Sequence, residues 1–373
     1  MTEGVVVTGM GLVTPVGTSV AEVFDALCTG RSGLSRPPEG HPLAASVDVA
    51  GFGPEIDATT VLPATEARVV DRYVVMALCA ARDALADAGL VVGRDVDPYR
   101  VGVIVSGTGG LATLEAQVVI RTQRGRLGVS PYLLPGMLPN MGAARIAIKY
   151  GIQGYSSSIA TACAAGAQSI GEAASRPFDR RRNGLVLGEG AGVFVLERAA
   201  HADARGAAGY ADVLGWGATN DAHHPTTPRP DGSGAAECMR RALSDAGIAG
   251  PDVGYLNAHG TSTKLGDLAE ATAIRTVFGT QSPPVSSSKA VTGHMLGASG
   301  VVESAASVMA MLHGLLPPTH NLDDPDPACE LDHIRKGPRA VEVDHVMSNS
   351  FGFGGHNISL VFGRPSTRHT RTV

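Results

Sequence analysis

Short apolar runs alternate along the chain with longer segments whose apolar residues recur every three to four positions. The short runs are typical of buried strands, and the periodic segments are typical of helices packed on one face. The predicted strands are Val5–Thr8, Val101–Ser106, Ser156–Ala160, Val193–Arg198, Val253–Asn257, Val285–Ser288, Val346–Asn349 and Ile358–Phe362. The predicted helices are Val20–Leu27, Val69–Ala88, Met141–Tyr150, Gly166–Ala174, Gly234–Ala246, Asp267–Phe278 and Val301–His313. This alternation predicts an α/β fold with helices on the sheet faces.

The composition indicates a large folded chain. Of 373 residues, 44% are hydrophobic and only 17% are charged, which favours a sizeable core over disorder. No apolar run is long enough to cross a membrane, and Met1–Gly17 is typical of a first strand and loop rather than a signal peptide. The five Cys are dispersed and form no CxxC pair, so we expect a cytoplasmic setting without disulfides or zinc.

The net charge of −5 disfavours binding to nucleic acid, but the basic residues are unevenly spread. Two arginine clusters have two interpretations, solvated loops or a docking patch for an acidic partner. They are Arg121, Arg124 and Arg126, and Arg176, Arg180, Arg181 and Arg182.

Cys163 stands where a predicted strand turns into a helix of small residues. A helix N-terminus favours a thiolate over a thiol, and the backbone N–H groups of such a turn can hold an oxyanion. The alternative is a buried structural cysteine, and this segment alone does not decide between the two.

Three further segments follow predicted strands, where the sites of α/β proteins open. The first carries His259 with hydroxyl residues behind it, and a loop histidine without a catalytic role is the alternative. The second carries Lys289, one of only four lysines, close to His294, and Glu303 on the next helix is a carboxylate partner for it. The third is the glycine-rich run Asn349–Asn357, which opens no helix after a first strand and so does not fit dinucleotide binding.

Taken together, these four motifs in this order resemble the β-ketoacyl-acyl-carrier-protein synthases of the thiolase superfamily, closest to the elongating type II enzymes. The resemblance runs from Val5 to Phe362. It implies a thiolase fold, with two similar halves in a five-layered αβαβα arrangement of mixed sheets. We place the halves at residues 1–200 and 201–366, followed by a tail at 367–373.

The resemblance also implies a reaction, the decarboxylative condensation of an acyl chain with malonyl-acyl-carrier protein in fatty-acid elongation. Cys163 would carry the acyl chain, and neutral His259 and His294 would donate N–H groups to the malonyl thioester. Lys289, paired with Glu303, would support the histidines.

Other roles follow from the same resemblance. Backbone N–H groups of Cys163 and Phe353 would form the oxyanion hole, with Phe353 also as a gate. Thr261 and Thr263 would bind the phosphopantetheine arm, which is a substrate carrier rather than a cofactor. Thr108 and Leu133 would line the tunnel for the acyl chain, and Phe351 would bind substrate.

The expected partners are an acyl carrier protein and a second subunit, either an identical copy or a chain-length-factor-like chain. No metal, nucleotide, nucleic acid or membrane is expected. Arg121, Arg124, Arg126 and Arg180 would dock the carrier protein.

One departure from the family pattern lies at Ala174–Ser175. The family has a few tens of residues here, including a central strand. Either residues of the natural chain are absent from the sequence, or the protein is a shortened variant with an altered dimer interface.

Of three alternatives to fatty-acid elongation, one stays open and two are disfavoured. The ketosynthase subunit of a type II polyketide synthase stays open. A degenerate, non-catalytic family member is disfavoured by the intact Cys163, His259 and His294. A biosynthetic thiolase is disfavoured because Phe351–Asn357 contains no second cysteine.

Overall fold

The computed structural model describes residues 4–39, 47–107, 109–125, 128–159, 175–366 and 371. The helices are α1 (Val20–Thr29), α2 (Ala64–Ala67), α3 (Arg72–Ala88), α4 (Leu111–Arg124), α5 (Leu133–Met137), α6 (Met141–Tyr150), α7 (Ala199–Ala204), α8 (Ser233–Ala246), α9 (Lys264–Phe278), α10 (Lys289–Thr292) and α11 (Ser299–His313). The strands are β1 (Val5–Val13), β2 (Leu34–Ser35), β3 (Ala50–Gly51), β4 (Val103–Ser106), β5 (Ser156–Ile159), β6 (Ala191–Arg198), β7 (Ala211–Asn220), β8 (Tyr255–Asn257), β9 (Val285–Ser286), β10 (Leu315–Leu316), β11 (Arg339–Ala340), β12 (His345–Gly352) and β13 (His356–Gly363).

The described strands form one long mixed sheet and three short pairs. The long sheet has the order β6-β1-β7-β13-β12-β8-β9, and β4 pairs separately with β5. Strands β1 and β7 join the two parts of the long sheet through only three residue pairs, Val5 to Val7 against Ala211 to Val213. The other pairs, β2 with β3 and β10 with β11, lie in loops.

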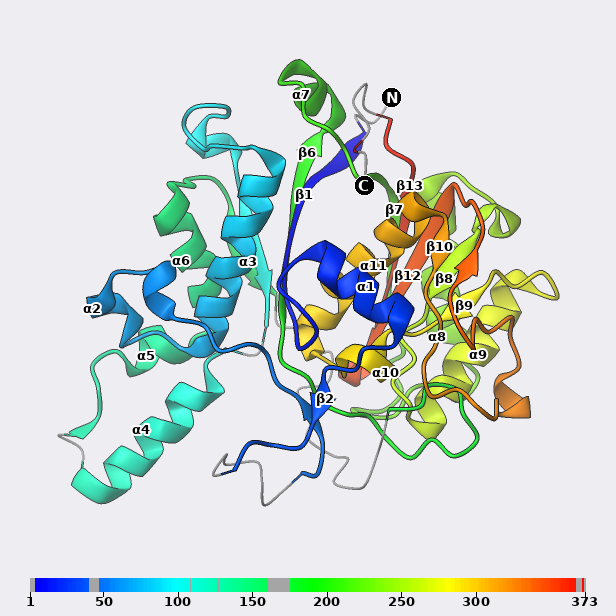
Figure 1. The fold of residues 1–373 in the computed structure, drawn as a ribbon, viewed down its shortest axis with the longest axis horizontal. Helices are drawn as coiled ribbons and strands as arrows, with labels where there is room; N and C mark the ends of the chain where they lie inside the picture. The colour runs from blue at the N-terminus through cyan, green and yellow to red at the C-terminus, as the bar shows by residue number, and fades with distance from the viewer. Residues whose placement is uncertain are drawn as a thin grey trace.

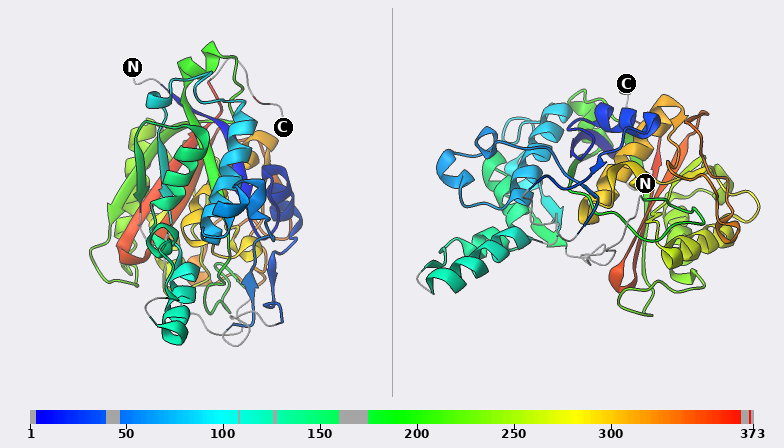
Figure 2. Two further views of the ribbon diagram at one scale, coloured as in Figure 1. Left: turned by 90° about the vertical axis from the view of Figure 1, so that its left-hand side faces the viewer. Right: turned by 60° about the horizontal axis from the view of Figure 1, so that its bottom comes forward.

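Helices and strands stack in five layers, as the resemblance implies. Figure 1 shows, from left to right, α3, the pair β1 and β6, the central helices α1 and α11, the strands β12 and β13, and the region of α8 and α9. Helix α11 contacts both β6 and β12, while α3 packs on β1 and α8 on β7. Figure 2 shows α4 extending away from these layers.

Glycines allow the outer helices to lie close to the sheet. A Cβ at Gly11 of β1 would stand 2.0 Å from the carbonyl oxygen of Ala80 in α3. A Cβ at Gly217 of β7 would stand 2.1 Å from the carbonyl oxygen of Cys238 in α8. We predicted that the first strand ends near Gly9, and this is wrong, because β1 continues to Val13 through that close helix contact.

Among the longer elements, α4 and β7 have no counterpart in the sequence predictions. Helix α4 buries none of its residues, and its apolar side chains Leu111, Val118 and Val119 are exposed. Strand β7 contains two glycines and mixed polarity, which weakens its strand signal.

The predicted helix Val69–Ala88 begins at Arg72, where the Asp71 carboxylate caps it by accepting the N–H of Tyr73. No helix in the described ranges is both long and apolar enough to cross a lipid bilayer.

Candidate active site

A pocket lies beyond the ends of β8 and β12, where loops leave the sheet. Its lining includes six of the residues predicted from the sequence, namely His259, Thr261, Thr263, His294, Phe351 and Phe353. They come from three separate segments of the second half, which the parallel strands β8, β9 and β12 bring to one edge. The carboxyl ends of neighbouring strands are where α/β folds place ligand sites.

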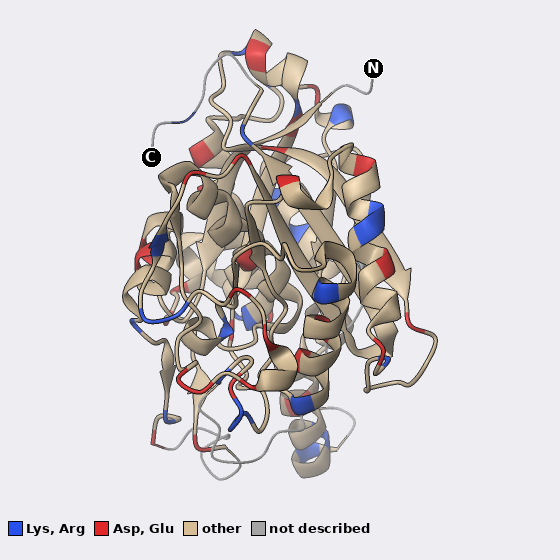
Figure 3. Ribbon diagram, turned by 90° about the vertical axis from the view of Figure 1, so that its right-hand side faces the viewer, with Lys and Arg blue, Asp and Glu red and all other residues tan. Residues whose placement is uncertain are grey.

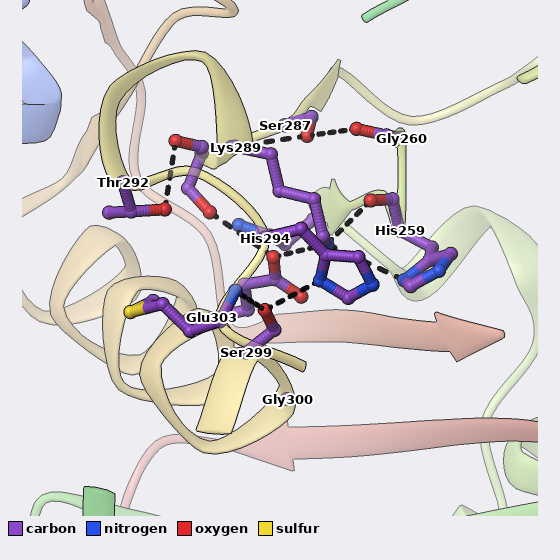
Figure 4. A network of polar contacts seen from close by, with 12 residues as sticks. His259, Gly260, Ser287, Lys289, Thr292, His294, Ser299, Gly300 and Glu303 are labelled. Atoms are coloured by element: carbon purple, nitrogen blue, oxygen red, sulfur yellow. Dashed lines mark hydrogen bonds and ion pairs between the residues drawn. The ribbon is translucent and has the colours of Figure 1, made fainter. Parts of the chain in front are cut away.

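A fully buried lysine lies behind this pocket. Lys289 forms an ion pair with Glu303, and both side chains are 1% exposed. The Lys289 ammonium also donates to the carbonyl oxygen of His259 at 2.6 Å, as Figure 4 shows. The lysine therefore connects α11 to the loop that carries His259, and its charge is compensated inside the protein.

The proton of His259 can be assigned from its neighbours. The Lys289 ammonium lies 3.4 Å from Nδ1 of His259, and an ammonium can only donate. Nδ1 is therefore the acceptor, and the ring proton stands on Nε2. His259 thus presents an Nε2–H donor at the pocket wall.

The ring proton of His294 is also placed on Nε2, in this case by the Ser299 hydroxyl. The Ser299 hydroxyl accepts the backbone N–H of Met295 at 2.9 Å and lies 3.0 Å from Nδ1 of His294 (Figure 4). Its own hydrogen is free to point to Nδ1, which leaves the proton on Nε2. That Nε2 is buried without a partner in the described part of the chain. A buried unpaired donor of this kind is costly unless a ligand uses it.

Both imidazoles are held neutral. Burial and the nearby Lys289 charge lower the pKa of His294 to about 3. Burial, Lys289 and His294 together place the pKa of His259 well below its usual value. The rings lie edge to face with centroids 5.4 Å apart, so two neutral N–H donors flank one space.

Two carboxylates on α9 fix the loop that carries His259, and the sequence reasoning did not identify them. Glu270 accepts the backbone N–H groups of His259 and Gly260 at 2.9 and 2.8 Å. Asp267 accepts those of Ser262 and Phe178. Their i, i+3 spacing on one helix, just after the histidine motif, was the available signal.

The glycine-rich loop is tied to a second loop across the pocket. Gly354, in the left-handed region at φ 82°, donates its N–H to the carbonyl oxygen of Pro225 at 2.6 Å. Asp221 donates its N–H to the carbonyl oxygen of Gly355. Asp221, Thr226, Thr227 and Pro228 of this second loop also line the pocket.

The sequence matches two family descriptions. "Beta-ketoacyl synthase, N-terminal domain" covers residues 2–176, and "Beta-ketoacyl synthase, C-terminal domain" covers residues 210–323. A 3-oxoacyl-[acyl-carrier-protein] synthase 2 from Synechocystis sp. is 39% identical over 411 aligned positions, covering 96% of this chain and 97% of that protein. The chain belongs to the β-ketoacyl synthase family.

Solved structures of other β-ketoacyl synthases have the same fold. The ishigamide ketosynthase/chain length factor superposes with a TM-score of 0.89 at 30% identity, covering 97% of this chain and 99% of that one. A ketosynthase in complex with its type II polyketide acyl-carrier protein gives 0.88 at 29% identity, with 97% and 99% covered. These matches confirm the predicted thiolase-type fold.

The alignment with the Synechocystis enzyme contains more positions than this β-ketoacyl synthase has residues to occupy. It spans 411 positions, whereas 96% of 373 residues is about 358, so about 50 positions hold no residue of this chain. This chain therefore lacks residues that the relative has within the aligned region. Ala174, which precedes the junction where the sequence predicts a shortfall, lies outside the described residues, as do Cys163, Thr108 and Arg126.

Other predicted residues lie away from the pocket of this β-ketoacyl synthase. Leu133 begins α5 and is not part of the described pocket lining. Arg121 and Arg124 stand in the last turn of α4, and the Arg180 guanidinium lies 3.7 Å from the Asp324 carboxylate on the surface. Arg182 is buried and paired with Asp326, so the second arginine cluster is partly structural rather than a free docking patch.

Figure 3 shows acidic and basic positions interspersed over the side formed by the second half of the chain. That side therefore presents no extended surface of a single charge. Arg121 and Arg124 of α4, on the other half, are exposed.

The low pKa of His294 predicts a pH-dependent stability. The unfolded imidazole takes up a proton near pH 6.5, whereas the folded one stays neutral to about pH 3. Protons therefore favour the unfolded state in this window, and stability falls as pH falls through it. Relative to His294→Gln, the wild-type unfolding free energy should fall by about 1.4 kcal/mol per pH unit below pH 6. Urea unfolding at three pH values measures this, with exposed His223→Gln as the control. Equal slopes for wild type and His294→Gln would contradict it.

Proposed function

We propose that this β-ketoacyl synthase joins an acyl chain, held on Cys163, to the malonyl group of malonyl-acyl-carrier protein. The products are 3-oxoacyl-acyl-carrier protein and carbon dioxide, as in fatty-acid elongation. The observation that carries the proposal is the pair of neutral Nε2–H donors, His259 and His294, on one pocket wall. The Synechocystis relative bears the name of an enzyme of this reaction class.

The chemistry assigns each side chain a step. The malonyl thioester oxygen gains negative charge as the bond to the leaving carboxylate breaks, and two N–H donors stabilise that enolate. The enolate carbon attacks the acyl thioester of Cys163, so a carbon–carbon bond forms and the carbon–sulfur bond breaks. The thiolate of Cys163 leaves and takes up a proton.

Neutral imidazoles suit this role better than charged ones. A histidine with an ordinary pKa would be partly protonated near pH 6.5 and could protonate the enolate before condensation. Burial and Lys289 keep both rings neutral, while Glu303 compensates the lysine. The proposed reaction requires no metal or nucleotide, since loss of carbon dioxide supplies the carbanion.

The Thr261 and Thr263 hydroxyls lie 3.1 Å apart on the pocket wall and provide donors for the amides of a phosphopantetheine arm. We expect the acyl chain to extend toward the first half of the protein, where Thr108 and Leu133 stand in the sequence. A cytoplasmic location fits the cysteine pattern.

Intact-mass measurement tests the nucleophile. Incubation with a panel of acyl-carrier thioesters should add one acyl mass to the wild-type chain and none to Cys163→Ala. Cys238→Ala is the matched control, because Cys238 is buried and its Sγ lies 3.1 Å from the Gly217 carbonyl oxygen. Acyl transfer onto Cys163→Ala would refute the assignment.

A second candidate is the ketosynthase subunit of a type II polyketide synthase. The observation that favours it is the close superposition on the ishigamide ketosynthase/chain length factor and on the type II polyketide ketosynthase described above. Condensation by the purified chain alone supports fatty-acid elongation as a homodimer. Activity that appears only with a chain-length-factor subunit supports the polyketide function.

Carrier-protein docking on α4 gives a separate prediction. Arg121→Glu with Arg124→Glu should weaken binding of an acyl carrier protein at low salt at least tenfold, because attraction between opposite charges becomes repulsion. Fluorescence anisotropy of a labelled carrier protein measures the affinity. Arg240→Glu, on exposed α8 surface, is the control, and an equal effect of both changes would rule out docking on α4.

A further inference from the structure

Part of the pocket wall comes from a loop without helix or strand. This second loop, residues 221–232, connects β7 to α8. Its residues Asp221, Thr226, Thr227 and Pro228 line the pocket together with both active-site histidines. Side chains on such a wall keep their positions only where hydrogen bonds hold the backbone of the loop.

One carboxylate closes the base of the second loop. The two oxygens of Asp221 accept the side-chain N–H of Asn357 in β13 at 2.7 Å and the backbone N–H of Arg229 at 3.0 Å. Asp221 is buried, whereas residues 222–226 are exposed. The base is therefore fixed to the sheet, and the exposed part needs hydrogen bonds of its own.

The exposed part has few backbone donors. Pro225 and Pro228 have no N–H, so between them only Thr226 and Thr227 can donate. The Pro225 carbonyl oxygen accepts the N–H of Gly354 at 2.6 Å, which ties this part to the glycine-rich loop. The shape of the wall then depends on where the two threonine N–H groups find an acceptor.

A single histidine nitrogen accepts both of these N–H groups. Nδ1 of His224 lies 3.1 Å from the backbone nitrogen of Thr226 and 3.1 Å from that of Thr227. The Thr226 hydroxyl oxygen lies 3.4 Å from the same nitrogen. An accepting ring nitrogen carries no proton, so the ring proton of His224 stands on Nε2. His224 thus caps this turn as an Asn or Asp side chain caps an Asx turn.

The influence of this cap is local. The His224 side chain is exposed, so it adds little to the buried core. Without Nδ1, the N–H groups of Thr226 and Thr227 would turn to water, and the loop would change its shape. The histidine therefore sets the place of two pocket-lining residues rather than the stability of the whole fold.

We propose that His224 is a positioning residue for the substrate. Its Nδ1 holds Thr226 and Thr227 in the loop shape that receives the phosphopantetheine arm, in the same pocket as Thr261 and Thr263. The inference rests on the proposed function, since the arm belongs to the substrate of that reaction. Because His224 acts through the two threonines and not on the reacting atoms, it governs substrate binding more than condensation.

Hydrogen exchange tests the cap without any substrate. The stretch Pro225–Pro228 contains just two exchangeable backbone amides, those of Thr226 and Thr227. His224→Phe keeps a ring and removes the acceptor, so both amides should exchange about tenfold faster than in wild type. Equal exchange in His224→Phe and wild type would overturn the proposal.

Two further variants separate the acceptor from the ring. His224→Asn supplies a carbonyl oxygen that can accept the same N–H groups, so exchange of the two amides should stay within about threefold of wild type. His223→Phe changes the exposed neighbouring ring and should leave their exchange unchanged. Faster exchange in His223→Phe, or equally fast exchange in His224→Asn and His224→Phe, would contradict the role of Nδ1.

Contact between the loop and the arm is tested with 4′-phosphopantetheine as the probe. A titration with this compound should slow exchange of the Thr226 and Thr227 amides in the wild-type chain, and should do so far less in His224→Phe. No acyl transfer is involved, so a failure of the proposed reaction would leave this result intact. Unchanged exchange of both amides across the titration would overturn the proposal.

Steady-state kinetics separates binding from chemistry. His224→Phe should raise KM for malonyl-acyl-carrier protein about fivefold or more and leave kcat within about twofold, because contacts shared by substrate and transition state change KM alone. His224→Asn should restore most of the loss. A fall in kcat with unchanged KM would overturn the proposal, and so would a lowered Tm of His224→Phe, which would identify a structural role instead.

Discussion

Replacing His294 with Ala is expected to slow condensation by about 10²–10³-fold while acylation of Cys163 continues. The reason is that the Nε2–H of His294 has no partner in the described structure and so is available to the developing enolate oxygen. Loss of one donor aimed at such an oxygen costs about this factor. Acyl transfer to the Cys163 thiol forms no enolate, so the rate of acylation should change far less than the rate of condensation.

Two assays separate the steps. Single-turnover release of carbon dioxide from malonyl-acyl-carrier protein measures the histidine-dependent step, and intact mass measures acylation. His294→Gln keeps an amide N–H and should lose less activity than His294→Ala. If both variants lose acylation and condensation equally, His294 holds the fold or the thiol rather than the enolate. Exposed His223→Ala controls for the loss of any imidazole.

Replacing Lys289 with Met is expected to lower the unfolding free energy by about 3–5 kcal/mol near pH 8. The change leaves the Glu303 carboxylate buried without its counter-charge, and breaking a buried pair from one side costs about this much. Burial, the largest influence, raises the pKa of Glu303 to about 7. The variant can therefore protonate Glu303 as pH falls, and the loss should be smaller at pH 5.

Guanidinium unfolding at pH 8 and pH 5 measures both effects. The double change Lys289→Met with Glu303→Leu removes both charges and should recover most of the stability. Arg241→Met is the surface control, because Arg241 and Glu237 are about half exposed and such pairs contribute about 0–1 kcal/mol. A loss for Lys289→Met that matches this control, or that does not change with pH, would show that the buried pair carries little energy.

Several parts of the site could be predicted because they follow strand ends in the sequence. His259 and Lys289 follow β8 and β9 closely, so parallel pairing brings them to one edge, and His294 follows the short helix α10 that begins at Lys289. The ion pair with Glu303 could also be predicted, because Lys289 stands among small residues where a buried lysine needs a carboxylate partner. The structure confirms these positions, while the catalytic roles stay proposals.

Other parts could not be read from the sequence. Glu270 and Asp267 look like ordinary helix carboxylates until α9 turns them toward the backbone of the histidine loop. Helix α4 carries apolar residues that are not buried, and β7 has glycines that allow close contact with α8. For the two carboxylates the only local signal was their i, i+3 spacing after the histidine motif, and it does not say which backbone groups they accept.

The sequence by itself determined the α/β class, the family and the order of the Cys, His, Lys–His and Gly–Phe–Gly motifs, because periodicity and motif spacing are local properties. Only the tertiary structure decided the proton positions on His259 and His294, because these depend on Lys289 and Ser299 approaching from other segments.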